Sequence, residues 1–304
     1  MRLHFHDDRL QIETPAKVNL FLEVLGKRSD GYHELESVML SVGLFDTLSF
    51  SRPPHNASDI QLSITSPAAR RAGTENLNEL PLDGRNLIVR AAELIRQETG
   101  YAGGVQIALT KRIPMEAGLG GGSSDAAATL VGLNRFWDLG LSSAELHRLA
   151  AQLGSDVNFF LDSVPVALCR GRGEQIEPAR LDRRWFGVIF KPTSGLSTAA
   201  VFRRWQPGEE LRSGSEFLEE FRKGRLGEIA RGLHNSLQLP ATALNLEVAE
   251  ILYHLRGEQC IGTLMSGSGS ACFALCHNRS QALRVAAKLR AKLAVRIDVV
   301  ETTA

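Results

Sequence analysis

The stretch Ile113–Leu130, IPMEAGLGGGSSDAAATL, places four glycines and two serines directly before an alanine-rich run. Glycine lets the backbone adopt positive φ angles and approach a ligand closely. The first N–H groups of a helix have no internal partner and lie at the positive end of its dipole, so they favour an anion. Ser123, Ser124 and Asp125 are residue types that favour a helix start. The stretch therefore predicts a phosphate-binding loop that leads into a helix.

Two common phosphate loops do not fit this stretch. The Walker pattern needs a lysine after its last glycine, but Gly122 is followed directly by Ser123. The dinucleotide pattern that would start at Gly118 needs a third glycine, where the chain has Ser123. A glycine-rich helix start that binds no ligand is the alternative interpretation.

Composition limits the classes of protein that the chain can belong to. Its 304 residues, 43% hydrophobic and 23% charged, are typical of a soluble globular protein with two domains or one large one. A net charge of +1 gives no basis for nucleic acid or a membrane surface as a partner. The N-terminus lacks the apolar core of a signal peptide, and no apolar stretch is long enough to span a bilayer. The four cysteines show no paired spacing, so we expect a cytoplasmic protein.

Hydrophobic periodicity and turn residues predict alternating strands and helices. This alternation indicates an α+β protein with helices on one side of a sheet. The polar segment 52–85 is expected to form loops around a short strand at Ile60–Ile64. The other strands are expected at 10–25, 37–51, 103–114, 164–171, 186–192, 272–276 and 295–301, and the helices at 86–99, from the glycine loop to 136, at 143–153, across 209–255 and at 279–292.

Two polar residues stand out in the apolar strand around residue 18. Side chains alternate along a strand, so Lys17 and Asn19 share one face and Val18 points to the other. Burying both is costly unless they have a partner, and a structural ion pair would satisfy that need as well as a catalytic role. Asp156 follows Gly154, where an aspartate is commonly a turn or cap residue. From the residues alone, both structural alternatives stay open.

A second glycine motif, Met265–Ala271 (MSGSGSA), would by itself be a tight turn between two strands. Together with the loop Pro114–Ser124 and the segment Gly154–Asp156, it resembles the motifs of the GHMP kinases, in the same order. That family includes galactokinase, homoserine kinase, mevalonate kinase and phosphomevalonate kinase. The resemblance implies a two-domain fold: a ribosomal S5 domain 2-like α/β domain at residues 1–165 and a ferredoxin-like α/β sandwich at residues 166–304.

The resemblance also implies ATP and Mg²⁺ as cofactors, with Lys17 and Asp156 as the catalytic pair. Asp156 would accept the proton of the attacking hydroxyl, and Lys17 would hold Asp156 ionised, in a reaction that depends on positioning and charge stabilisation. Ser124 and the loop N–H groups would hold the phosphate oxygens. The residues expected to bind ATP are Pro114, Met115, Glu116, Ala117, Gly118, Leu119, Gly120, Gly121, Gly122, Ser123 and Ser124, and those expected to bind the acceptor include Asn19, Gly267, Ser268 and Gly269.

Four stretches are similar to one branch of the family, whose acceptor is a cytidine diphosphate-linked methylerythritol phosphorylated on its 2-hydroxyl. They are PAKVNLFLEVLGKRSDGYHELESVM (15–39), NLIVRAA (86–92), KRIPMEAGLGGGSSDAA (111–127) and LGSDVNFFL (153–161). In this branch Tyr32 would stack on the cytosine, His33 would hydrogen-bond to it, and Phe202 would close its other side. A flat ring with a polar edge suits aromatic stacking and an imidazole.

Some features depart from that pattern or stay open. Glu116–Ala117 replaces a more glycine-rich pair, Asn158 stands where relatives frequently have proline, and the segment 52–85 has no assigned role. The metal ligands are unassigned, and we expect a monomer or a weak homodimer. The alternatives are a relative that acts on mevalonate phosphates, including the diphosphate decarboxylase, and a nucleotide-binding protein without catalysis. The Asp30–His33 turn favours the cytidylyl acceptor.

Overall fold

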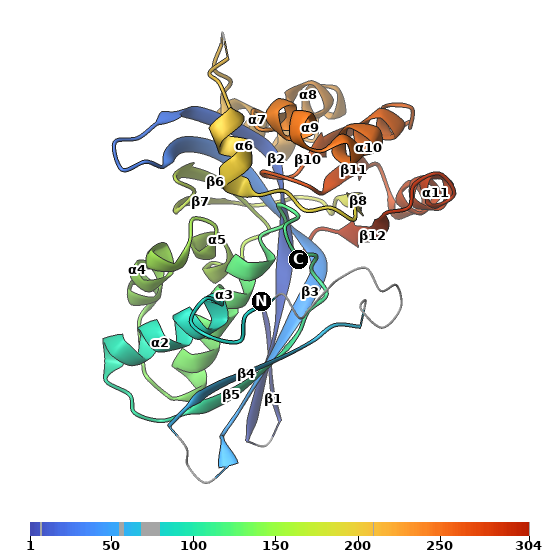
Figure 1. The fold of residues 1–304 in the computed structure, drawn as a ribbon. Helices are drawn as coiled ribbons and strands as arrows, with labels where there is room; N and C mark the ends of the chain where they lie inside the picture. The colour runs from blue at the N-terminus through green and yellow to red at the C-terminus, as the bar shows by residue number, and fades with distance from the viewer. Residues whose placement is uncertain (7, 55–57, 68–79, 209, 304) are drawn as a thin grey trace. The chain divides into compact units, whose positions relative to one another are not determined.

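The computed structural model describes residues 1–6, 8–54, 58–67, 80–208 and 210–303, and its chain forms two compact units (Figure 1). Two long strands, β2 (Arg9–Lys27) and β3 (His33–Ser51), contribute residues to both. Unit 1 consists of residues 1–16, 45–114 and 121–163, and unit 2 of residues 17–44, 115–120 and 164–304. The chain passes from unit 1 to unit 2 for the last time after Ser163, and unit 2 also includes two earlier segments.

Unit 1 places its helices on one side of its strands (Figure 1). The strand order is β1-β2-β3-β5-β4; β4 pairs with β5 in parallel, whereas β1 with β2 and β3 with β5 pair antiparallel. The helix α2 begins at the Asn86 cap and ends at Gly100, whose φ of 67° closes it as the sequence predicts. The elements are β1 (Arg2–His6), β4 (Ile60–Thr65), β5 (Val105–Thr110), α2 (Leu87–Thr99), α3 (Gly121–Phe136), α4 (Ser143–Leu153) and α5 (Val157–Leu161).

Unit 2 contains a four-stranded antiparallel sheet of order β10-β11-β8-β12. Its chain order of strand, helices, strand, strand, helix, strand is that of a ferredoxin-like sandwich, as expected. Helices α10 and α11 pack against this sheet. The elements are β8 (Phe186–Lys191), β10 (Gly262–Met265), β11 (Cys272–Cys276), β12 (Arg296–Glu301), α10 (Leu246–Arg256) and α11 (Arg279–Arg290).

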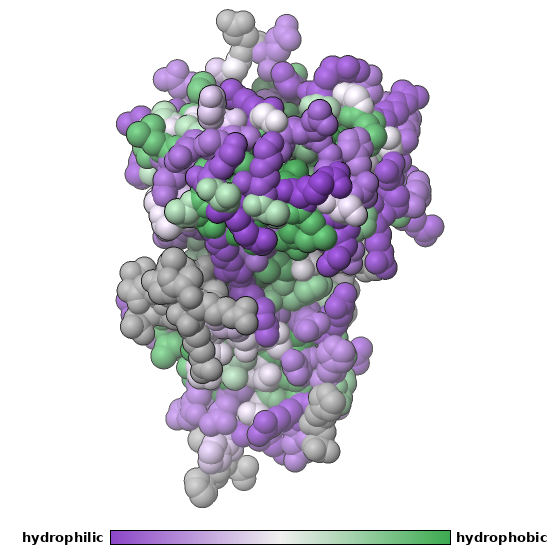
Figure 2. Space-filling view, turned by 90° about the vertical axis from the view of Figure 1, so that its right-hand side faces the viewer, coloured by the Kyte–Doolittle hydropathy of each residue, from purple (hydrophilic) through white to green (hydrophobic). Residues whose placement is uncertain are grey.

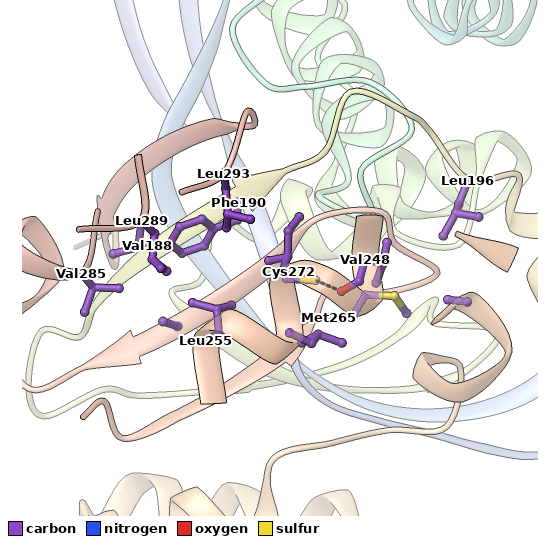
Figure 3. Close-up of a cluster of buried hydrophobic side chains, with 14 of the residues drawn as sticks. Val188, Phe190, Leu196, Val248, Leu255, Met265, Cys272, Val285, Leu289 and Leu293 are labelled. Carbon is purple, nitrogen blue, oxygen red and sulfur yellow. Dashed lines mark hydrogen bonds between the residues drawn. The ribbon is translucent and has the colours of Figure 1, made fainter. Parts of the chain in front are cut away.

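The core of unit 2 lies between this sheet and its helices (Figure 3). Phe190 of β8 and Leu255 of α10 are fully buried. Burying each such side chain contributes about 1.5–3 kcal/mol. The thiol of Cys272 lies in the same cluster, and all four cysteines are free, as their spacing predicts. This core holds the strands whose ends carry the second glycine motif.

The expected helical stretch 209–255 is largely helical, and over its described residues 210–255 the structure divides it into four helices and a short strand. The helix α7 ends at Gly224, which has a φ of 69°, and Asn245 caps α10 by accepting from two backbone N–H groups. A two-residue strand, β9 (His234–Asn235), pairs with β2. The helices are α7 (Gly214–Lys223), α8 (Leu226–Gly232), α9 (Gln238–Leu244) and α10.

The elements β7, α5 and α6 were not expected from the sequence. The hairpin strand β7 (Gln175–Ala179) is largely exposed and pairs with β6 (Val166–Gly171), so it lacks the apolar alternation of a half-buried strand. The helices α5 and α6 (Thr198–Arg204) are shorter than two full turns. Residues 55–57 and 68–79 of the expected loop segment lie outside the described residues.

Candidate active site

The first glycine loop changes unit in its middle, so its two parts have different surroundings. Residues 115–120 belong to unit 2, where Gly118 and Gly120 both have φ of 70°. A side chain on Gly118 would place its Cβ 2.0 Å from the carbonyl oxygen of Ser266. Gly118 is therefore required both by its backbone conformation and by the close approach of the second glycine motif.

The second glycine motif lies against this part of the loop. The N–H groups of Ser270 and Ala271 donate to the carbonyl oxygens of Glu116 and Ala117, at 3.2 and 3.1 Å. The Ser266 hydroxyl donates to the carbonyl oxygen of Gly118 at 2.9 Å. Residues far apart in the sequence thus form one hydrogen-bonded glycine-rich surface within unit 2.

The start of α3 forms the other part of the loop, in unit 1. Gly122 is exposed and Ser123 is half-buried, so their backbone and the Ser123 hydroxyl are open to a ligand. The Ser124 side chain is fully buried, and its hydroxyl donates to the carbonyl oxygen of Pro15 at 2.6 Å. The expectation that the Ser124 hydroxyl holds a phosphate is therefore not met in this structure, because the side chain faces the interior of unit 1.

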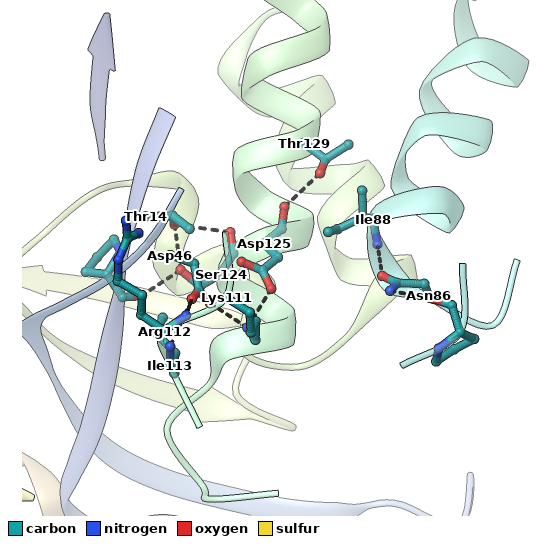
Figure 4. A network of polar contacts seen from close by, with 12 residues as sticks. Thr14, Asp46, Asn86, Ile88, Lys111, Arg112, Ile113, Ser124, Asp125 and Thr129 are labelled. Atoms are coloured by element: carbon teal, nitrogen blue, oxygen red, sulfur yellow. Dashed lines mark hydrogen bonds and ion pairs between the residues drawn. The ribbon is translucent and has the colours of Figure 1, made fainter. Parts of the chain in front are cut away.

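A buried ionic cluster fixes this start of α3 (Figure 4). The Nζ of Lys111 donates to Asp46 and to Asp125, at 2.5 and 2.7 Å, and all three side chains are at most 4% exposed. Asp46 also accepts the backbone N–H groups of Arg112 and Ile113, where the chain enters the loop. We call these three residues the Lys111 cluster.

The Lys111 cluster has one cation and two carboxylates, and this imbalance affects the pKa values of its members. Burial raises the pKa of the Asp125 carboxyl well above its usual value, and one of its oxygens, Oδ1, has no hydrogen-bond partner. Burial opposes the charge of Lys111, but the two aspartates outweigh it and raise the pKa of this lysine. The sequence analysis missed this cluster, although a lysine directly after a strand and an aspartate in an alanine-rich helix are a signal for a buried ion pair.

Lys17 and Asn19 point to the same side of β2, as the alternation predicts. Both are buried, and the Nζ of Lys17 donates to the Oδ1 of Asn19 at 2.6 Å. The Nδ2 of Asn19 donates to Ser37, and the Asn19 N–H donates to the hydroxyl of Ser266. In unit 2, Asn19 therefore connects the expected catalytic lysine to the second glycine motif.

Asp156 lies in unit 1, at the start of α5, and is half-buried. Its carboxylate does not cap that helix. The preceding Gly154 lies beside the start of α3, since a Cβ on it would be 3.9 Å from the Ser123 hydroxyl. Unit 1 thus places the segment that leads to the expected base beside Ser123. Lys17 belongs to unit 2, and the pairing of Lys17 with Asp156 stays a prediction.

The turn before β3 presents Tyr32 and His33. The Arg28 N–H donates to the Tyr32 carbonyl oxygen, and Gly31, with a φ of 86°, closes the turn. The side chain of Tyr32 is 54% exposed, and the Arg172 guanidinium lies 4.8 Å from its ring centre. One face of Tyr32 is therefore covered by a cation that the sequence analysis did not single out.

His33 and Phe202 are brought together, although 169 residues separate them. Their rings stack at 4.8 Å, and the edge of Trp205 lies 5.7 Å from the His33 ring centre. Burial, followed by the charge of Lys27, lowers the pKa of His33, so the imidazole is neutral at pH 7 and has both a donor and an acceptor nitrogen. Trp205 was missed; it directly follows α6 as its C-cap, and an aromatic residue three positions after Phe202 is a signal that could have found it.

Gly267, Ser268 and Gly269 form the tip of the second motif. Gly267 and Gly269 have φ of 54° and 86°. The Nδ2 of Asn235 donates to the carbonyl oxygens of Met265 and Gly267, at 2.8 Å each, and so holds the motif from the side of β9. The Ser268 hydroxyl lies 2.8 Å from that of Thr198 in α6.

The side-chain clusters, the helices and the exposed side chains each relate to a possible metal, membrane or partner. Among the described residues no group of three or more His, Cys, Asp or Glu side chains could hold a metal ion, and none of the described helices combines the length and apolarity of a membrane span. Figure 2 shows one face, on which hydrophilic side chains are interspersed with hydrophobic ones. Leu246 and Tyr253 are strongly exposed and share a face of α10, an apolar feature that the sequence analysis did not find.

Two family models match the chain. The GHMP kinases N terminal domain matches residues 86–169, and the GHMP kinases C terminal domain matches residues 217–295. A 4-diphosphocytidyl-2-C-methyl-D-erythritol kinase from Pelotomaculum thermopropionicum is 43% identical over 90% of this chain and 92% of its own length.

Solved structures agree with this family. A crystal structure of 4-(cytidine 5'-diphospho)-2C-methyl-D-erythritol kinase is 36% identical, with a TM-score of 0.76, and the match covers 97% of this chain and 99% of that one. A mevalonate pyrophosphate decarboxylase from Streptococcus pyogenes has a TM-score of 0.68 at 17% identity over 97% of this chain and 96% of its own. The second likeness shows the fold alone.

Proposed function

Because the chain belongs to the GHMP kinases, and within them to the 4-diphosphocytidyl-2-C-methyl-D-erythritol kinases, we propose that it transfers the γ-phosphoryl group of ATP to the 2-hydroxyl of that acceptor. The products are ADP and the 2-phosphate, in the non-mevalonate pathway to isoprenoid precursors. The observation that carries this conclusion is the 43% identity over 90% of the chain to a kinase of that name. The stacking of His33 on Phe202 supports the cytidylyl acceptor within unit 2.

The cytosine recognition assigned to Tyr32, His33 and Phe202 follows from their chemistry. The exposed face of Tyr32 and the ring of Phe202 offer flat surfaces on which a pyrimidine can stack. The neutral imidazole of His33 can donate to one polar atom of the base and accept from another. Arg172, held over Tyr32, adds positive charge beside an acceptor that carries a diphosphate.

The ATP phosphates are assigned to the first glycine loop. Gly118 and Gly120 in their positive-φ conformations, and the exposed Gly122, leave backbone N–H groups without covering side chains. Ser124 contributes its backbone there, because its hydroxyl is engaged with Pro15. Mg²⁺ bound to the phosphates would neutralise part of their charge. The chain's own part is to bind and orient the phosphates.

Lys17 and Asp156 are assigned the chemical step. Phosphoryl transfer passes through a loose transition state, so orientation of the attacking oxygen and control of its proton matter most. Asp156 accepts the proton of the 2-hydroxyl, and the ammonium group of Lys17 keeps Asp156 ionised and orients the acceptor oxygen. Asn19 holds the Nζ of Lys17 in place, and Gly267, Ser268 and Gly269 face the acceptor. We further propose that the protein is cytoplasmic and that it is a monomer or a weak homodimer.

The decisive experiment is a coupled ADP-release assay with purified protein, Mg-ATP and the cytidylyl acceptor. Mevalonate, phosphomevalonate, homoserine and galactose serve as parallel acceptors. Turnover with the cytidylyl acceptor alone is the expected result. Turnover with another alcohol but not with this one would refute the acceptor, and CO₂ release from mevalonate diphosphate would identify the decarboxylase instead.

The variant Asp156→Asn tests the base separately from binding. We expect turnover to fall by about 10³-fold or more, since the isosteric amide cannot accept the proton. The dissociation constant for the nucleotide should stay within about 3-fold of wild type, since the amide preserves the shape of the side chain. The matched control is Asp162→Asn, which alters the aspartate that contacts His147 after the same short helix. Near-normal turnover of Asp156→Asn would remove this residue from the role of base.

A further inference from the structure

Ser270 of the second glycine motif lies between two segments that have different proposed ligands. Its side chain is fully buried in unit 2. One neighbouring segment is the part of the first glycine loop at residues 115–120, and the other is the loop 192–197 that leads into α6. The glycine loop is assigned to the nucleotide, and α6 carries Phe202 of the acceptor site.

On the nucleotide side, Ser270 contacts the carbonyl oxygen of Glu116. This oxygen accepts the Ser270 N–H at 3.2 Å and lies 3.3 Å from the Ser270 hydroxyl. Glu116 has a φ of 49°, a conformation that non-glycine residues rarely adopt. The position of the Glu116 carbonyl therefore depends on contacts such as those from Ser270.

On the acceptor side, the Ser270 hydroxyl lies 2.8 Å from the carbonyl oxygen of Ser194. Three residues later, Ser197 caps α6 with its side chain, and Thr198 contacts Ser268 of the same glycine motif. Phe202, on α6, stacks on His33. A continuous path of contacts therefore runs from Ser270 to the aromatic pair.

The hydroxyl of Ser270 has one proton and two carbonyl acceptors. It donates that proton to Ser194 at the shorter distance, and the Ser270 N–H donates to Glu116, so the two bonds do not compete. Because the group is buried, no solvent replaces either bond when it is lost. A shift of either loop therefore changes how strongly Ser270 holds the other.

We propose that Ser270 is a positioning residue that couples nucleotide binding at residues 115–120 to acceptor binding at His33 and Phe202. This inference rests on the proposed function, since it assigns the two ligands to these two places. Each bound ligand holds its own loop in the position at which Ser270 bonds to it, so the coupling is positive. Binding of either ligand tightens the other by the same factor, as thermodynamic linkage requires.

A second contact links the same two loops. A Cβ on Gly195 would lie 2.0 Å from the Oε2 of Glu116 and 2.8 Å from its Cβ, so the Glu116 side chain lies directly on the backbone of Gly195. Glu116 is a non-glycine residue with a φ of 49°, so it brings a side chain to this position of the loop. Its side chain adds a packing contact to the path through Ser270.

Titration calorimetry measures the coupling directly in the wild-type chain. The dissociation constant of the cytidylyl acceptor is measured with and without saturating Mg²⁺ and a non-hydrolysable ATP analogue, and then in the reverse order. We expect at least about 5-fold tighter binding in both orders, within the usual range of coupling between sites. Independent binding of the two ligands would overturn the coupling and leave the kinase function standing. Failure of the acceptor to bind at all would overturn both.

The variant Ser270→Ala should reduce the coupling factor, which is the ratio of the acceptor dissociation constants without and with the analogue, to about 2-fold or less. The analogue alone should bind within about 3-fold of wild type. Ser213→Ala is the matched control, because it removes a serine hydroxyl that caps α7 in the same unit. Thr198→Val changes an exposed residue and should lower the factor as well, and Thr198→Ser, which keeps the hydroxyl, should restore it. An unchanged factor in both Ser270→Ala and Thr198→Val would overturn the role of Ser270.

Discussion

The two parts of the first glycine loop are held by opposite kinds of interaction. The start of α3 in unit 1 rests on the Lys111 cluster, where one buried lysine binds two buried aspartates. Residues 115–120 in unit 2 rest on neutral contacts, namely backbone N–H groups and the hydroxyls of Ser266 and Ser270. A buried ionic cluster is costly to break but gives a rigid end point, whereas each neutral hydrogen bond contributes little and lets the loop adjust. One continuous motif thus has a firmly held end and an adjustable end.

Removing the cation should have the largest effect. Lys111→Met leaves Asp46 and Asp125 buried without a counter-charge, and we expect a loss of about 3–5 kcal/mol in the free energy of unfolding. Urea unfolding followed by circular dichroism measures this loss. Lys292→Met, at an exposed lysine, is the control and should change little. A loss below about 1 kcal/mol for Lys111→Met would mean that the two ends are held with similar strength.

A glycine substitution tests the close approach at the neutral end. Gly118→Ala should cost about 3 kcal/mol, because φ is 70° and the new Cβ would lie 2.0 Å from the Ser266 carbonyl oxygen. Gly140→Ala is a matched control with a φ of 68° and no neighbour within 4 Å, so it should cost only the backbone strain of about 1–2 kcal/mol. Equal losses of unfolding free energy would show that the contact with Ser266 contributes nothing.

The pH dependence of stability should reveal the excess carboxylate of the Lys111 cluster. Burial raises the folded pKa of Asp125 above its ordinary 3.8, so between these two values the folded state binds more protons and stability falls as pH rises. Asp125→Asn keeps an oxygen that accepts from Lys111 and removes this titration. The stability of the variant relative to wild type should therefore increase with pH, by up to about 1.4 kcal/mol per unit.

Unfolding of both proteins from pH 4 to pH 8 measures this difference, and groups elsewhere cancel in the comparison. Asp138→Asn, at an exposed aspartate that directly follows Trp137, is the control. A constant difference between Asp125→Asn and wild type over this range would mean that the pKa of Asp125 is not raised.

The smallest effect is expected for one neutral hydroxyl. Ser266→Ala removes the group that accepts the Asn19 N–H and donates to the Gly118 carbonyl oxygen, and should cost about 1 kcal/mol of unfolding free energy. Ser63→Ala, on the exposed side of β4, should stay within about 0.5 kcal/mol of wild type. A loss as large as that of Lys111→Met would remove the distinction between the two ends of the loop.

Much of the fold could be predicted from local features of the sequence. The Asn86 cap and Gly100 bound α2, Ser142 begins α4 with a capping box, and the alternation around Lys17 places it beside Asn19. The glycine loop and the second motif were located by residue type, since positive φ and close approach demand glycine. The turn at Asp30–His33 was singled out only through the resemblance to one branch of the GHMP kinases. These features depend on interactions within a few residues of the chain.

The tertiary structure decided what long-range packing controls. The length of the helices within 209–255, the edge strand β7 and the inward turn of Ser124 all depend on neighbours distant in the sequence. So do the partners of Lys111, which lie 65 and 14 residues away, and the contact of His33 with Phe202 and Trp205. The sequence by itself predicted a phosphate loop from its glycines, serines and helix start, because these are properties of short segments, and the resemblance to the GHMP kinases added the residues expected to bind a base. Which of them face a ligand and which face the core was set by burial, since buried charges and hydroxyls must find partners wherever the fold brings them.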